Sequence, residues 1–179
     1  MNVIPLILMV GVGLIVIYVL YTAQRYRADA IRALATRSGM HYLGRALPRS
    51  LTLEGTPFHH FSKVWNVIDG EPHGARIMAF DCQVGVGKRS WRRSVVAVEG
   101  DGNVFSSVPL HPDMTIDRTG RWKILYYRPK PHFILRITGL TPIEELEANL
   151  NAVLTGSKML RHLIPEEMRV QVQVQKTIQ

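Results

Sequence analysis

The sequence predicts an α+β protein, in which an N-terminal transmembrane helix precedes a small antiparallel β-sheet domain with one or two flanking helices. Residues 3–23 form an uninterrupted apolar run without Lys, Arg, Asp or Glu. Between residues 61 and 138, short apolar stretches are separated by turns that contain Gly and Pro, as in consecutive strands. A strong helix start follows at Thr141. We therefore expect three segments: a transmembrane helix at 1–23, a juxtamembrane basic helix at 24–39 and a soluble α+β domain at 40–179.

The apolar run has the length of a membrane span. A bilayer core about 30 Å thick requires about 20 helical residues at roughly 1.5 Å each. A cleaved signal peptide is the alternative, and it would have a basic N-terminal region and a cleavage site with small residues. The run is preceded only by Met1 and Asn2 and leads directly into Gln24 and Arg25. These features favour an uncleaved anchor.

Charge predicts the orientation of this anchor. Residues 24–49 carry six Arg against one Asp, within a chain whose net charge is +8. Because positive residues stay on the cytoplasmic side of a membrane helix, the N-terminus should be outside and the domain in the cytoplasm. A lone cysteine excludes an intrachain disulfide and agrees with a reducing compartment. We expect the membrane interface to hold three aromatic residues: Tyr18, Tyr21 and Tyr26.

Local patterns predict the remaining elements. The first helix should continue to about Thr36 and stop at Ser38-Gly39, where glycine can adopt the left-handed conformation. Residues 44–57 read as a connector. Strands are expected at 61–68, 75–84, 94–98, 122–126, 133–137 and 168–174. Thr141, Pro142 and Glu144 form a capping box that begins a helix ending at Gly156. A short second helix is expected at 158–163.

A basic, glycine-containing loop at 84–93 is the most suggestive local feature. Its two glycines and four cations surround a tryptophan, a combination that can bind an anionic headgroup or an acidic surface. It lacks the spacing of a nucleotide-binding phosphate loop, and a solvated hairpin tip is the alternative interpretation. With the arginines after the anchor, it supplies our candidate lipid or partner contacts: Arg25, Arg27, Arg32, Lys88, Arg89, Trp91, Arg92 and Arg93.

Other reactive residue types lack a catalytic pattern, so we predict no catalytic residue, metal site or cofactor. The histidines have no ligand spacing, and Cys82 should be a buried, inert thiol in a strand. Asp81 and Glu99 could form a carboxylate pair across neighbouring strands, although solvated or salt-bridged carboxylates are the simpler interpretation. The three tryptophans could stack bases, but core positions are more common for them, and no nucleic acid is expected as a partner.

Several stretches carry a resemblance to a known family. They are residues 58–70 (FHHFSKVWNVIDG), 79–82 (AFDC), 85–88 (GVGK), 94–97 (SVVA) and 108–112 (VPLHP). Their order resembles a family of uncharacterised bacterial membrane-anchored proteins with one N-terminal helix and a soluble domain of unknown function. The resemblance implies the same layout in the bacterial inner membrane. It implies no activity.

We therefore expect a non-enzymatic, membrane-tethered accessory or scaffold subunit, whose domain contacts other subunits of a membrane complex or lipid headgroups. The alternatives are a stand-alone module that binds anionic lipid or a small anion, and a hydrolase of unfamiliar type.

Overall fold

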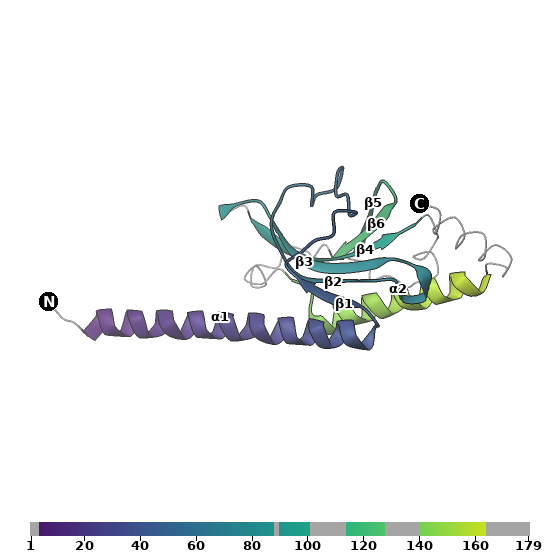
Figure 1. Ribbon diagram of the computed structural model, residues 1–179. Coiled ribbons are helices and arrows are strands. Elements are labelled where there is room, and N and C mark those ends of the chain that lie inside the picture. The colour runs from purple at the N-terminus through teal and green to yellow at the C-terminus, as the bar shows by residue number, and fades with distance from the viewer. Residues whose placement is uncertain (1–3, 88–89, 101–113, 128–139, 164–179) are drawn as a thin grey trace.

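The computed structural model describes residues 4–87, 90–100, 114–127 and 140–163, and it has the predicted α+β architecture. A long N-terminal helix, α1 (Ile4–Arg37), projects from a domain built on one antiparallel sheet (Figure 1). Within the described residues, the sheet has six strands in the order β1-β2-β3-β4-β6-β5. The strands are β1 (His41–Gly44), β2 (Phe61–Gly70), β3 (Ile77–Val84), β4 (Trp91–Glu99), β5 (Met114–Thr119) and β6 (Trp122–Tyr127).

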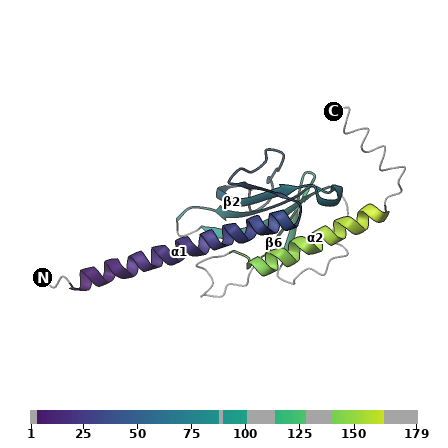
Figure 2. The same cartoon turned by 60° about the horizontal axis from the view of Figure 1, so that its bottom comes forward.

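Both helices cover the same face of the sheet, as Figure 2 shows. The second helix, α2 (Ile143–Leu163), lies beside the C-terminal part of α1. Two stripes of apolar residues pack together on the sheet: Ile31, Leu34 and Ala35 from α1, and Leu146, Leu150 and Val153 from α2. In the part of the chain that the structure describes, these residues belong to one of two hydrophobic cores, one on each face of the sheet.

The segment between β1 and β2 covers the opposite face. Leu51, Leu53 and Phe58 are buried there against the even-numbered residues of β3. Two hydrogen bonds fasten this cover to the sheet, because Trp122 Nε1 donates to the Ser50 carbonyl at 3.0 Å and Thr119 Oγ1 donates to the Glu54 carbonyl at 2.6 Å. The predicted connector is therefore a structural layer of the domain.

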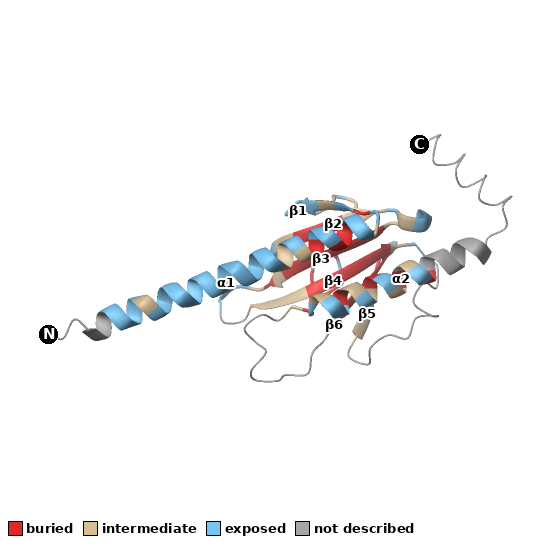
Figure 3. Ribbon diagram, turned by 90° about the horizontal axis from the view of Figure 1, so that it is seen from below, coloured by how far each residue is buried: buried red, intermediate tan, exposed pale blue. Residues whose placement is uncertain are grey.

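Helix α1 is continuous from the apolar run into the domain. Its side chains are largely exposed in the N-terminal half and become buried only near the sheet, as the colours of Figure 3 show. It is the one helix in the described part of the chain that is long and apolar enough to cross a membrane. Because Ile31, Leu34 and Ala35 belong to the domain core, the second half of the helix is part of the domain.

The predicted stop of α1 is confirmed. The helix ends at Arg37, and Gly39 has a φ of 66°. The amide of Met40 donates to the carbonyl of Ala35 at 2.8 Å, and Gly39 donates to Thr36 at 3.3 Å. This pattern is a Schellman motif, in which glycine avoids the Cβ clash of the left-handed conformation.

Four predicted strands are confirmed as β2, β3, β4 and β6, whereas the strands β1 and β5 were not predicted. Helix α2 was predicted as two helices divided at Gly156, and this division is wrong. An isolated glycine costs a helix only about 1 kcal/mol, so the tertiary packing of α2 can carry the helix through it. The predicted strands at 133–137 and 168–174 lie outside the described residues.

Candidate functional site

A buried carboxylate joins α1 to the middle of the sheet. The side chain of Asp81 on β3 is fully buried, and that of Arg27 on α1 is 13% exposed. Arg27 Nε donates to Asp81 Oδ2 at 2.8 Å and Nη2 donates to Oδ1 at 2.9 Å. This two-point geometry is the strongest form of an arginine–carboxylate interaction.

Neighbouring side chains complete the coordination of this carboxylate. Ser94 Oγ on β4 donates to Asp81 Oδ1 at 2.7 Å, and Asn66 Nδ2 on β2 donates to Oδ2 at 2.9 Å. Arg27 also donates from Nη2 to Ser94 Oγ and from Nη1 to the backbone carbonyl of Thr141, both at 2.8 Å. We call Arg27, Asn66, Asp81 and Ser94 the Asp81 network. It joins α1, three strands and the segment that leads into α2.

A backbone irregularity positions one member of the network. The pairing of β2 with β3 shifts register between Trp65 and Ile68, and Asn66 within this bulge has a φ of 54°. Asparagine tolerates this left-handed conformation better than most residues. Its side chain donates to Asp81 and accepts a hydrogen bond from the Tyr42 hydroxyl at 3.1 Å, which extends the network to β1.

The Asp81 network is suited to holding α1 in a fixed position on the sheet. Four donor atoms occupy the two oxygens of Asp81: two nitrogens of Arg27, the hydroxyl of Ser94 and the amide of Asn66. A carboxylate occupied in this way and fully buried is poorly placed to exchange protons with a substrate. The site therefore fixes the angle and rotation of α1 relative to the sheet.

The structure separates the arginines that we grouped as surface contacts. Two residues apart on a helix correspond to about 200°, so Arg25 and Arg27 point in nearly opposite directions. Arg25 is exposed, whereas Arg27 points into the domain and belongs to the Asp81 network rather than to the surface that we expected. Arg32 is exposed, pairs with Asp29 at 2.8 Å and has its guanidinium 4.8 Å from the ring centre of Tyr42.

The loop residues have mixed environments. Trp91 is half-buried and packs edge-on against Phe58, with ring centres 5.6 Å apart. Arg93 lies over Trp91 at 4.9 Å, and Arg92 lies over Trp65 at 5.8 Å, on the other face of the sheet. Lys88 and Arg89 lie outside the described residues. The three expected interface residues are all strongly exposed on α1: Tyr18, Tyr21 and Tyr26.

Cys82 is the buried thiol that the alternation of β3 predicted. It is fully buried on the face covered by the segment between β1 and β2. Burial, and to a smaller extent the charge of Asp81, raise its pKa to about 12, against the opposing effect of Arg93. A thiol with this pKa stays protonated near neutral pH, and the thiolate is the reactive form.

Asp81 and Glu99 do not form a carboxylate pair. Asp81 lies opposite Ser94 on β4, five residues from Glu99 along the same strand. Glu99 instead binds Arg121 at 2.8 Å, at the end of the sheet remote from the Asp81 network. Within the described residues, no group of three or more His, Cys, Asp or Glu side chains is placed to hold a metal ion.

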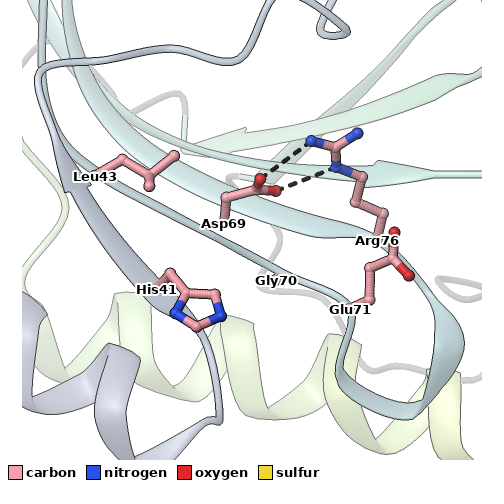
Figure 4. A pocket seen from close by; sticks show the side chains of 6 residues that line it. All are labelled: His41, Leu43, Asp69, Gly70, Glu71 and Arg76. Atoms are coloured by element: carbon pink, nitrogen blue, oxygen red, sulfur yellow. Dashed lines mark hydrogen bonds and ion pairs between the residues drawn. The ribbon is translucent and has the colours of Figure 1, made fainter.

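A shallow, open depression lies at that remote end, beside the turn between β2 and β3 (Figure 4). Asp69 faces Arg76 across it and accepts hydrogen bonds from Nε at 3.3 Å and from Nη2 at 3.1 Å. The hydrogen bond to Asp69 raises the pKa of Arg76, so the guanidinium stays charged. The central acid and base of the depression therefore neutralise each other.

The comparisons with protein-family models, with curated proteins and with solved structures found no match for this chain. The resemblance described from the sequence remains a prediction. Function must therefore be inferred from the geometry of the molecule itself.

Sequence reasoning missed most of the Asp81 network, although two signals for it exist. Asp81 is the charged residue of a largely apolar strand, and buried charges require a partner. Arg27 stands four residues before Ile31, on the helical face that continues with Leu34 and Ala35. Those signals mark both residues as inward-facing, but only the fold shows that they meet.

Proposed function

We propose that this protein is a non-enzymatic, membrane-tethered scaffold or accessory subunit, whose domain is held in a fixed orientation directly at the bilayer surface. The observation that carries this proposal is the continuity of α1. Ala23, at the end of the apolar run, is only four positions before Arg27 in the Asp81 network. That separation corresponds to about 6 Å along a helix. No flexible linker intervenes between the apolar run and the core.

A helix that is shared by the apolar run and the domain holds the domain in a fixed orientation. A domain on a flexible tether samples many orientations, whereas a domain that shares a helix with its anchor presents the same surface to its surroundings. The arginines after the apolar run favour an orientation with the N-terminus outside and the domain in the cytoplasm. The resemblance of the sequence implies that the membrane is the bacterial inner membrane. Other subunits of a membrane complex are the partners that we propose.

Purification of the tagged full chain in a mild detergent tests the proposal. We expect stoichiometric membrane-protein partners to co-purify with the full chain. A variant with a flexible Gly-Ser-Gly insertion between Ala23 and Gln24 keeps the anchor and the domain but frees their relative orientation. It should retain less of the partner. Isolation of the full chain as a clean monomer would contradict the scaffold function.

A stand-alone module for anionic lipid is the second candidate, and the exposed cations close to the apolar run favour it. Its binding to liposomes would require anionic lipid and would weaken with salt, without any protein partner.

A further inference from the structure

Strand β3 runs antiparallel to α1. At one end, Met40 just after α1 packs on Gly70, whose partner across the sheet is Ile77 at the start of β3. Further along, Arg27 of α1 binds Asp81 of β3. As the helix runs from Arg27 toward Met40, the neighbouring strand therefore runs from Asp81 back to Ile77. The C-terminal end of β3 consequently points toward the apolar half of α1, and Figures 1 and 2 both show this end of the sheet extending along α1 in that direction.

The rise per residue of a strand shows how far the C-terminal end of β3 extends along α1. Val84 is three residues beyond Asp81, which corresponds to about 10 Å at 3.3 Å per residue. The same distance along α1 from Arg27 corresponds to about seven residues. If the axes of β3 and α1 are parallel, Val84 is thus level with Leu20, within the last turn of the apolar run. A tilt between the two axes shortens the distance that β3 extends along α1. The β3–β4 hairpin extends beyond Val84 in the same direction.

The residues at this end have the chemistry of a membrane interface. Val86 at the hairpin tip is 82% exposed. Lys63, Gln83 and Arg92 lie opposite one another on β2, β3 and β4. Because side chains alternate along each strand, this row faces the same side as Asp81, the side that α1 covers. Trp65 is on that side too and is half-buried beneath Arg92, so the cations flank an amphipathic ring.

Charge differs between the two ends of the sheet. The end remote from the apolar run carries the acidic residues Asp69, Glu71 and Glu99, near Arg76 and Arg121. At the end near the apolar run, the described residues of β2, β3 and β4 beyond Asp81 include cations but no carboxylate. An anionic surface would therefore attract the β3–β4 end over the opposite end.

We infer that the β3–β4 end of the sheet is a second membrane contact, in which Val86 enters the acyl boundary while Lys63 and Arg92 bind anionic lipid headgroups of the leaflet that α1 leaves. Trp65 lies at headgroup depth between them. This inference rests on the proposed anchoring by α1. The two attachments, one helix and one sheet end, would prevent the domain from tilting about the helix exit.

A depth-sensitive label on the full chain tests the contact. Val86→Cys is labelled with an environment-sensitive fluorophore, and the buried Cys82 does not compete for the reagent. Glu71→Cys is the matched control, because it lies in the turn at the other end of β2 and β3. In nanodiscs that contain phosphatidylglycerol, a nitroxide-bearing lipid should quench the label at position 86 several-fold more strongly than the label at 71. Equal quenching at both positions would overturn the inference.

A second pair of variants tests the role of charge. Lys63→Gln with Arg92→Gln, in the Val86→Cys background, should reduce the quenching in anionic nanodiscs. The control Arg118→Gln with Arg121→Gln removes two cations from the remote β5–β6 hairpin and should leave the quenching unchanged. An equal loss in both pairs would overturn the assignment of headgroup binding to Lys63 and Arg92.

Resistance to carbonate extraction separates this inference from the proposed function. If the chain is extracted from membranes, the anchoring by α1 fails and the second contact fails with it. If the chain remains anchored while position 86 is no more quenched than position 71, only the second contact is refuted.

Discussion

At the residue scale, Asp81 shows how a buried charge can be kept in a small domain. Removing a carboxylate from water is costly, and the two-point bond to Arg27 with hydrogen bonds from Ser94 and Asn66 offsets that cost. A buried ion pair adds little net stability compared with well-packed apolar residues. Removal of only one of the two partners is strongly destabilising, because the other charge is left buried without a partner. We therefore regard the Asp81 network as a determinant of how α1 docks.

Arg27→Met should lower the free energy of unfolding by about 3–5 kcal/mol, because it leaves the buried carboxyl group of Asp81 without its main partner. The exposed Arg25 supplies the control, and Arg25→Met should change stability by no more than about 0.5 kcal/mol. Urea titration of the full chain in mild detergent, followed by tryptophan fluorescence, measures both. The double variant Arg27→Met/Asp81→Leu should regain much of the loss. Equal effects of the two arginine substitutions would contradict this assignment.

Cys82 makes stability sensitive to alkaline pH. Its pKa is raised from 9.0 to about 12 by burial, so the folded state favours the protonated thiol. The associated stability is fully present below pH 9 and is lost as the pH rises toward 12, at up to about 1.4 kcal/mol per pH unit. Because other groups also titrate there, the test is the difference between the wild type and Cys82→Ala. The variant should lose less stability over this interval, and parallel curves would contradict the prediction.

At the element scale, α1 combines two roles in one helix. Its 34 residues span about 51 Å, which exceeds the thickness of a bilayer core by about 20 Å. The surplus is the part that carries Ile31, Leu34 and Ala35 into the core. The Schellman motif at Gly39 then reverses the chain, so that Met40 is buried against β2. We call the contact between Met40 and Gly70 the Met40 joint. Its position determines where the sheet begins relative to the helix.

Gly70→Ala tests the joint. A Cβ at this position would lie 3.0 Å from Met40 Cγ and 3.1 Å from Met40 Cα, and the backbone atom cannot move aside cheaply. We expect a loss of about 1–3 kcal/mol in the free energy of unfolding, typical of overpacking. Combining Gly70→Ala with Met40→Ala should cost less than the sum of the two single effects, because the side-chain part of the clash is gone. Strict additivity of the two losses in stability would show that residues 40 and 70 are not in steric conflict.

At the scale of the whole molecule, the proposed function requires rigidity between the anchor and the domain. Arg27 of the Asp81 network and the apolar stripe lie within the last third of α1, Met40 follows directly after the helix, and all of them pack on one sheet. A domain built in this way transmits the tilt of its helix to its whole surface. The second membrane contact would add a further constraint to that orientation.

The Gly-Ser-Gly insertion between Ala23 and Gln24 separates folding from orientation. It leaves every contact of the domain intact, so the free energy of unfolding should stay within about 0.5 kcal/mol of the wild type. Freed from the apolar half of α1, the domain should lose part of the lipid quenching of the label at position 86. Circular dichroism and the nanodisc measurement check the two expectations separately. Undiminished quenching would show that the β3–β4 end binds membranes without help from the helix.

Features that depend only on nearby residues can be read from the amino-acid sequence. The apolar run, the stop at Gly39, the positions of β2, β3, β4 and β6 and the burial of Cys82 follow from periodicity and turn chemistry. These signals act within a few residues, so no knowledge of the fold is needed to read them. The short strand β1 and the polar strand β5 carry too little alternation to be recognised.

Tertiary structure alone decided which residues meet. Arg27 and Asp81 are 54 positions apart, and Arg27 and Thr141 are 114 apart. An arginine next to an apolar run resembles a lipid contact in sequence, because charge near a membrane span is itself the expected pattern. The place of Arg27 on the helical face of Ile31 and Leu34 indicates that it points inward, but not which residue it binds. That partner is decided by the packing of side chains from distant parts of the chain, which local sequence patterns do not encode.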